Sequence, residues 1–311
     1  MAAGLLLSGC GTSSGVAAQP ASLPAPAPVA TTAAASSGDW TRFGYDAART
    51  SRAPRGIAAA KIPGLRERRV ALPGTIDSSP IYLGGVRVAG ARRDVIFVTT
   101  TYGRTLALDA ATGRELWRFE PRSYPSVAGS PQITTATPVT DRRAIYAASP
   151  DGRIHKLRVS NGREIRSGGW PVSVTKDATR EKIAAALNLD GRTLLVTTGG
   201  YVGDAPPYQG KVVAIDRTSG RIRSVFNSLC SNRRAIIRPA SCSASDSAIW
   251  GRAGAVVDPA DHHLLVATSN GPFDGRRNWG DSVLELSARA GRLLRHWTPT
   301  DQDQLAAGDI D

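Results

Sequence analysis

The sequence predicts an all-β fold made of repeated sheets of short strands, and three observations lead to this prediction. The stretch from Asp94 to Trp117, DVIFVTTTYGRTLALDAATGRELW, contains three β-rich runs separated by turn residues. Similar stretches follow three more times downstream. The chain also has 32 glycines and 20 prolines among 311 residues, which suit many turns, and 41% hydrophobic residues, which can form a large core.

The first stretch has the residue order of two hairpins that share a strand. Residues 95–101 and 105–108 alternate in the way that half-buried strands require. In the turn that follows, the side chains of Asp109 and Thr112 can bond nearby backbone N–H groups, and Gly113 can adopt a positive φ. Residues 114–119 form the returning strand, with Trp117 as its apolar anchor. We therefore expect Asp109 to have a structural role and not a catalytic one.

The later copies keep the spacing of this unit, with inner strands expected at 79–83, 133–139, 183–189 and 249–257. Asp216 and Gly220 repeat the turn chemistry in the third copy, and Trp297 takes the place of Trp117 in the fourth. Paired glycines are ten residues apart in the first three copies and eleven apart in the fourth: Gly103 and Gly113, Gly152 and Gly162, Gly210 and Gly220, Gly280 and Gly291. Such repetition indicates radially stacked sheets or a solenoid.

The run ALDAATGRELW, residues 107–117, has the form Ala-x-Asp-x-x-Thr-Gly-x-x-x-Trp and resembles the repeat of a known family. This family is the β-propellers built from pyrroloquinoline-quinone (PQQ)-type repeats, and residues 214–220 match the pattern loosely. The resemblance covers roughly residues 40–311 and implies four-stranded antiparallel blades. It does not choose a function, because quinoprotein dehydrogenases and the scaffold lipoprotein of outer-membrane barrel assembly share these repeats.

Two segments predict that the ring of blades is open. Residues 64–72, GLRERRVAL, resemble a fourth blade strand whose first three strands are missing upstream. Residues 298–311 resemble a connector leading into a further first strand. We therefore predict about four blades in an incomplete ring, within a propeller domain that spans residues 39–311.

The N-terminal part predicts export and a lipid anchor. Leu7-Ser8-Gly9-Cys10 resembles a lipobox, with Cys10 as the lipidated residue, although no Lys or Arg precedes it, so residues 1–10 are interpreted as a truncated lipoprotein signal. Residues 11–38 are rich in Ala, Pro, Ser and Thr and are predicted to be a flexible linker. No run reaches the roughly 18 apolar residues of a membrane-spanning helix. The expected location is the cell envelope, in the periplasm or on the cell surface.

Three long insertions, 199–210, 227–247 and 270–280, are predicted to lie on one face of the blades. Long loops gathered on one face of a rigid scaffold usually carry binding, although they can also simply cap a core. Their arginines and aromatic residues suit an acidic or aromatic partner. The candidate binding residues are Tyr201, Tyr208, Arg233, Arg234, Arg238, Phe273, Arg276 and Arg277.

The two cysteines that follow Cys10 lie within one insertion and predict a disulfide between Cys230 and Cys242. Such a bridge would contribute roughly 2 to 3 kcal/mol. Metal binding is the weaker alternative, because these thiols lack further ligands nearby in sequence. The adjacent His262 and His263 point to opposite faces if they enter a strand. No metal site is predicted.

Charge and motifs exclude several functions. The net charge is +13, but 34 arginines and 5 lysines are scattered without a basic run or nucleic-acid motif, so no nucleic-acid partner is expected. No Cys-x-x-Cys-His, adjacent Cys-Cys or Gly-x-Ser-x-Gly motif is present, and we predict no catalytic residues and no cofactor.

The favoured function is a lipid-anchored, non-catalytic envelope scaffold that binds a protein or polysaccharide partner through its loop-rich face. Two alternatives remain open. One is part of a quinoprotein oxidoreductase that binds PQQ with calcium, and the other is a carbohydrate- or cell-wall-binding propeller.

Overall fold

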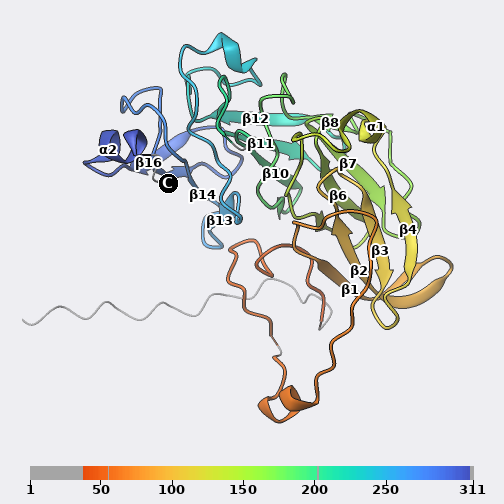
Figure 1. Cartoon of the computed structure of the whole chain (residues 1–311). Coiled ribbons are helices and arrows are strands. Elements are labelled where there is room, and N and C mark those ends of the chain that lie inside the picture. Colours follow the sequence, from red (N-terminus) through yellow and green to blue (C-terminus); the bar gives the residue numbers. More distant parts are fainter. Residues whose placement is uncertain (1–37, 55, 202, 309–311) are drawn as a thin grey trace, which may run out of the picture. The chain divides into compact units, whose positions relative to one another are not determined.

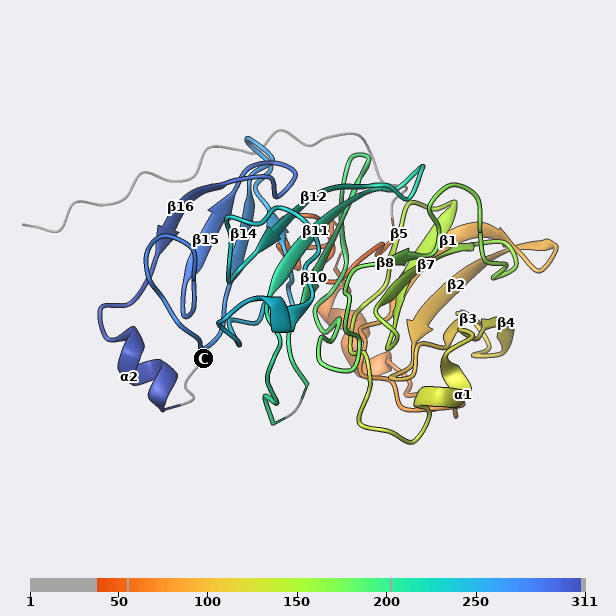
Figure 2. The same cartoon turned by 90° about the horizontal axis from the view of Figure 1, so that it is seen from above.

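The computed structural model describes residues 38–308 except 55 and 202, so Cys10 and residues 1–37 of the predicted signal and linker lie outside the described residues. Within the described part, four antiparallel sheets of four strands each confirm the predicted fold (Figure 1). Figure 2 shows these four sheets following one another in chain order. None of the helices in the described part is of a length and hydropathy that could span a bilayer.

Each sheet is one blade. Blade 1 consists of β1 (Ile81–Val88), β2 (Ala91–Thr99), β3 (Thr105–Asp109) and β4 (Glu115–Phe119). Blade 2 consists of β5 (Val139–Thr140), β6 (Ala144–Ser149), β7 (Arg153–Arg158) and β8 (Val172–Ser173). Blade 3 consists of β9 (Asn188–Asp190), β10 (Thr193–Thr198), β11 (Lys211–Asp216) and β12 (Ile222–Asn227). Blade 4 consists of β13 (Val256–Val257), β14 (Leu264–Ala267), β15 (Val283–Leu286) and β16 (Leu293–Trp297).

The remaining elements are short. Two are 3-10 helices, η1 (Ala59–Gly64) and η2 (Pro239–Ser241), and two are α-helices, α1 (Tyr124–Val127) and α2 (Gln302–Ala307). The inner strands β1, β5, β9 and β13 overlap the four ranges expected from the sequence.

The repeat turns fold locally, as their residues predict. Asp109 Oδ1 accepts hydrogen bonds from the backbone N–H of Ala111 at 3.1 Å and Thr112 at 3.0 Å, and Gly113 has φ +76°. Asp216 Oδ1 does the same with the N–H groups of residues 218 and 219, and Gly220 has φ +74°. The Ser219 hydroxyl here replaces that of Thr112. These carboxylates therefore hold turns.

Arginine and backbone donors lower the pKa of both turn carboxyls. For Asp109 the main cause is the hydrogen bond from Arg93, at 3.1 Å. For Asp216 it is the backbone N–H of Ser219, followed by Arg223 at 2.9 Å. The folded state thus favours the charged form, which is also the form that the turn requires.

Trp117 joins two blades, whereas its predicted counterpart Trp297 does not. Trp117 is buried, contacts Phe97 and donates from Nε1 to the Val159 carbonyl in blade 2 at 2.9 Å. A Cβ at Gly162 would lie 2.5 Å from the Trp117 ring, so the turn glycine also leaves room for this tryptophan. Trp297 is 64% exposed, because no sheet of the described residues covers its side of blade 4.

Blade 2 departs from the repeat in its fourth strand. The strand expected directly after Gly162 is reduced to one bridge between Leu157 and Glu164. β8 forms later, at Val172–Ser173, after two glycines and Pro171 have redirected the chain. Trp170 fills the space beside Tyr146, with ring centroids 5.4 Å apart.

Apolar clusters connect successive blades but do not close a ring. One cluster joins blades 1 and 2, a second joins blades 2 and 3, and a third joins blades 3 and 4. No cluster of the described residues joins blade 4 to blade 1. On the outer side of blade 4, Leu265, Val283 and Trp297 are exposed.

The strand expected over residues 65–72 is not formed. This segment runs past the outer side of blade 1, where Leu72 and Ile76 pack against Val98 and Leu106, and Val70 lies beside Gly113. It has no strand neighbour among the described residues, and an extended segment without a ladder is not a strand. The prediction of a blade strand over this segment was therefore wrong.

A segment near the start of the described residues, 40–51, touches the inner strand of every blade, and we name it the hub segment. Trp40 pairs with Tyr82 of β1 through two backbone hydrogen bonds of 2.8 and 2.9 Å. The carbonyl of Thr41 accepts from Thr140 of β5, and that of Ala47 accepts from Val257 of β13.

Two arginines of the hub segment complete its contacts with blades 3 and 4. Arg42 donates to the Asn188 side chain at 2.9 Å and to the Leu189 carbonyl at 2.6 Å, in β9. Arg49 donates to four carbonyls, those of residues 43, 186, 187 and 253. Burial, followed by the nearby Arg42 charge, lowers the pKa of Arg49. Four acceptors around one half-buried guanidinium make it a structural centre.

We expect Arg49→Ala to destabilise the protein by about 2 to 4 kcal/mol, because it leaves buried carbonyls without donors. Denaturant unfolding measures the loss. Arg52→Ala is the matched control, since Arg52 is exposed and directly follows the hub segment. Equal stability of the two variants would contradict the central role of Arg49.

Acid should weaken the repeat turns. Because the folded-state pKa of Asp216 is below its unfolded value, its contribution to stability is present above pH ~4 and is lost as the pH falls below that value. Asp216→Asn should therefore flatten the dependence of unfolding free energy on pH between about 4 and 2. Asp301→Asn, at an exposed residue without a side-chain cap bond, should leave the slope unchanged.

Candidate functional site

The three predicted insertions meet on one face of blades 3 and 4, and we call residues 199–210, 227–247 and 270–280 together the loop face. The Asp246 N–H donates to the Tyr208 carbonyl at 3.0 Å, which joins the first and second insertions. The Ser231 N–H donates to the Arg277 carbonyl at 3.0 Å, which joins the second and third. The three insertions therefore lie in contact with one another, as predicted from the sequence.

The middle insertion has its own small core. Cys230 and Cys242 form the predicted disulfide. Leu229 and Ile237 are buried against this bridge, and the Cys230 N–H donates to the Asn278 side chain at 3.1 Å. The insertion is therefore tied both to itself and to its neighbour.

The aromatic residues predicted for binding are mostly used for packing. Tyr208 is 1% exposed, stacks on Trp250 and donates its hydroxyl hydrogen to Asp204 at 3.0 Å. The Tyr201 hydroxyl donates to the Ala178 carbonyl at 2.8 Å. Phe273 is half-buried between Trp279 and His296. The Tyr208 ring is therefore buried, whereas Tyr201 is only partly buried and is held through its hydroxyl.

The arginines divide into one that is engaged within its loop and four that are exposed. Arg233 donates to the carbonyl and hydroxyl of Ser241 at 2.8 and 2.9 Å. The exposed ones form no ion pair or side-chain hydrogen bond with a described residue, and they are Arg234, Arg238, Arg276 and Arg277. Their guanidinium groups are available to a partner.

A groove at the loop face adds an arginine that the sequence did not indicate. Its cavity of about 330 Å³ lies between the outer strands β12 and β16. Phe226 and Trp279 form its apolar part, and three guanidinium groups, of Arg234, Arg276 and Arg292, line it. Arg292 directly follows a repeat turn, so in the sequence it resembles an ordinary solvent-exposed strand residue.

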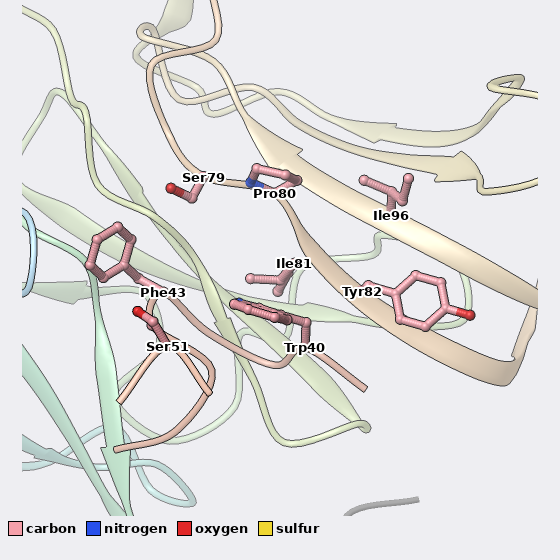
Figure 3. Close-up of a pocket in the computed structure, with 9 residues that line it drawn as sticks. Trp40, Phe43, Ser51, Ser79, Pro80, Ile81, Tyr82 and Ile96 are labelled. Atoms are coloured by element: carbon pink, nitrogen blue, oxygen red, sulfur yellow. The ribbon is translucent and has the colours of Figure 1, made fainter. Parts of the chain in front are cut away.

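A second cavity, of about 470 Å³, lies between the hub segment and blade 1 (Figure 3). Trp40 and Phe43 of the hub segment and Pro80, Tyr82 and Ile96 of blade 1 line it. No charged side chain is among its described lining residues. It is a mainly apolar surface beside blade 1, and its polar side-chain groups are the hydroxyls of Ser51, Ser79 and Tyr82.

Blade 2 contains a serine, a histidine and a glutamate in the order of a catalytic triad. His155 Nε2 lies 2.8 Å from Ser149 Oγ, and His155 Nδ1 lies 2.5 Å from Glu164 Oε1. The hydrogen bond with His155 lowers the pKa of Glu164. However, Ser149 has no exposed surface, so its hydroxyl cannot reach a substrate in this structure.

Beside the loop face, a lysine and a glutamate form a fully buried ion pair. Lys211 and Glu181 have no exposed surface, and the Thr175 hydroxyl also donates to Glu181. Burial raises the pKa of Glu181 and lowers that of Lys211. Since no substrate can reach them, the pair supports the insertion above it and is not a catalytic site.

We expect Lys211→Met to destabilise the protein by about 3 to 5 kcal/mol, because Glu181 would then be a buried charge without a partner. The double variant Glu181→Leu with Lys211→Met should lose less than the sum of the two single variants. Denaturant unfolding of all four proteins tests this, and additive losses would contradict a coupled pair.

One group of metal-type ligands occurs among the described residues, at the outer side of blade 4. His263 Nδ1 lies 2.9 Å from Asp261 Oδ2 and 2.7 Å from Glu285 Oε1. Arg295 also pairs with Glu285, at 2.7 Å. His262 instead contacts Asp190 of blade 3, so the two histidines diverge as predicted. The side chains of Asp261, His263 and Glu285 are therefore already paired, with one another and with the Arg295 guanidinium.

Comparison with known proteins places the chain in a family. Residues 58–235 match the family described as outer membrane protein assembly factor BamB. The chain belongs to this family of PQQ-repeat propellers.

Curated relatives include enzymes. The chain is 25% identical over 256 residues to quinohemoprotein alcohol dehydrogenase ADH IIB of Pseudomonas putida, covering 73% of the chain and 34% of that protein. It is 24% identical over 233 residues to polyvinylalcohol dehydrogenase of a Sphingopyxis strain, covering 70% of the chain and 33% of that protein. The chain thus spans about a third of the length of these relatives.

Solved structures confirm the fold alone. Quinohemoprotein alcohol dehydrogenase ADHIIG of Pseudomonas putida aligns with a TM-score of 0.66 and 18% identity, covering 85% of this chain and 40% of that one. The enzyme of Comamonas testosteroni aligns with a TM-score of 0.63 and 17% identity, covering 84% and 41%.

Proposed function

We propose that this protein is an exported, non-catalytic propeller scaffold that binds a protein partner in the cell envelope through its loop face. The observation that carries the proposal is a set of four exposed arginines that form no ion pair within the described part of the chain, on insertions that hydrogen bonds and a disulfide hold together. Family membership supports it, because the matched family is described as an outer membrane protein assembly factor. Lipid anchoring through Cys10 is part of the same proposal.

Physical reasoning connects this arrangement to binding. Arginine is enriched where proteins meet, because its planar guanidinium forms paired hydrogen bonds with carboxylates. Loops that are already fixed lose little conformational entropy when a partner binds. The Cys230–Cys242 bridge and the link from Ser231 to Arg277 provide this order in the unbound protein.

A quinoprotein dehydrogenase is the second candidate, favoured by the 25% identity to the Pseudomonas putida enzyme. The one described carboxylate cluster does not fit calcium. Calcium takes six to eight oxygen ligands. The described carboxylate cluster supplies Asp261 and Glu285 together with a histidine, and Arg295 already pairs with Glu285. At the inner strands, Arg42 and Arg49 add two positive charges that oppose a cation.

Photo-crosslinking in the source cells tests the scaffold proposal. A crosslinking residue in place of Arg238 or Arg277 should give one common protein adduct, because both positions are exposed on the loop face. The same residue in place of Arg114, on an exposed repeat turn of blade 1, should not give that adduct. Adducts from residue 114 alone would show that the loop face is only a cover.

Covalent labelling tests the absence of catalysis. A fluorophosphonate that attacks activated serines should not label the native protein, because Ser149 is fully buried. The matched control is Ser149→Ala. Labelling of the wild type that this substitution abolishes would show that the serine, histidine and glutamate of blade 2 act on substrates.

A further inference from the structure

We infer that the groove between β12 and β16 binds a carboxylate side chain from an acidic segment of a protein partner. This inference rests on the proposed function, because two of the three arginines in the groove belong to the loop face. It goes further by naming the chemistry of the partner and the place where it binds.

The groove is small, and arginines from three segments line it. Its cavity of about 330 Å³ is at the small end of the range of ligand sites. Arg234 and Arg276 reach it from two insertions, and Arg292 reaches it from the start of β16. A carboxylate between them can accept paired hydrogen bonds from guanidinium groups approaching from different directions.

The charge of the groove is unbalanced. Its described lining contains three guanidinium groups and no carboxylate. The nearby Asp274 is engaged elsewhere, since its Oδ1 accepts from the backbone N–H groups of residues 276, 277 and 278 at 2.7 to 2.9 Å. Phe226 and Trp279 form the apolar wall of the groove, and the three guanidinium groups give it a positive charge that attracts an anion.

The groove favours an acidic peptide over a polysaccharide. A sugar ring gains by stacking on an open aromatic face, but Trp279 is 5% exposed and its Nε1 already donates to Ser231 Oγ at 2.9 Å. Tyr208 is buried as well. The groups that remain available are guanidiniums, and these recognise carboxylates.

The two loops that supply Arg234 and Arg276 are held in register before any ligand binds. The Cys230 N–H donates to the Asn278 side chain, and the Trp279 N–H donates to the Ser228 carbonyl at 3.0 Å. Binding therefore requires ordering of side chains and not of whole loops, which lowers its entropic cost.

Fluorescence anisotropy with dye-labelled octa-glutamate tests the inference on the whole chain, with octa-glutamine as the neutral control. The groove variant carries Arg234→Ala, Arg276→Ala and Arg292→Ala. The matched control variant carries Arg114→Ala, Arg221→Ala and Arg289→Ala, which removes the same charge from exposed positions outside both the groove and the loop face. We expect the Kd to rise about 30-fold or more in the groove variant and less than about 3-fold in the control.

Three outcomes would overturn the inference. They are equal losses in both variants, no preference of the wild type for octa-glutamate over octa-glutamine, and stronger competition by oligogalacturonate than by the acidic peptide. The first leaves the proposed function intact, because crosslinking from the loop face is a separate measurement. Melting temperatures of both variants should match the wild type, and Arg→Gln at the same three groove positions repeats the test if the alanine variant melts earlier.

Discussion

Arg49 is the residue on which the order of the described blades depends most directly. Its guanidinium donates to carbonyls of residues 186 and 187, before β9, and of residue 253, before β13. Together with backbone bonds from the rest of the hub segment to β1, β5 and β13, this links the inner edges of all four blades. Four sheets that do not close into a ring lack the mutual support of a complete propeller. The hub segment, which forms hydrogen bonds at the inner strand of each blade, supplies part of that support from the inside.

With the inner edges fixed, the blades can carry long loops without losing their packing. Clusters between successive blades bury the apolar faces of the strands, and the repeat turns satisfy their own backbone groups through Asp109 and Asp216. The loop face is supported from below by the buried pair of Lys211 and Glu181 and from within by a disulfide. Rigid strands below and restrained loops above are the arrangement in which binding residues are usually displayed.

The polar clusters of this protein show why geometry must be considered together with exposure. Ser149, His155 and Glu164 have the distances of a catalytic triad, yet the serine is fully enclosed. The arginines of the groove are exposed, and their side chains form no ion pair or hydrogen bond among the described residues. Groups that satisfy one another stabilise the fold, whereas unsatisfied groups of one charge at the surface are free to bind a ligand of opposite charge.

The sequence by itself determined the features that depend on neighbouring residues. The Asp-x-x-Thr-Gly turn and the Cys230–Cys242 pair follow from short-range chemistry, whereas the four-stranded blades followed from the resemblance of the repeats to PQQ-type propellers, and the structure bears them out. Only the tertiary structure decided which predicted residues are free. It buried Tyr208, left Trp297 exposed and brought Arg292 to a groove with Arg234.

The contacts of the hub segment were also decided by the tertiary structure. Arg49 donates a hydrogen bond to the carbonyl of Ala253, which lies 204 residues further along the sequence. A local pattern cannot encode such a contact, because the energy of a buried arginine depends on acceptors that the fold alone brings together.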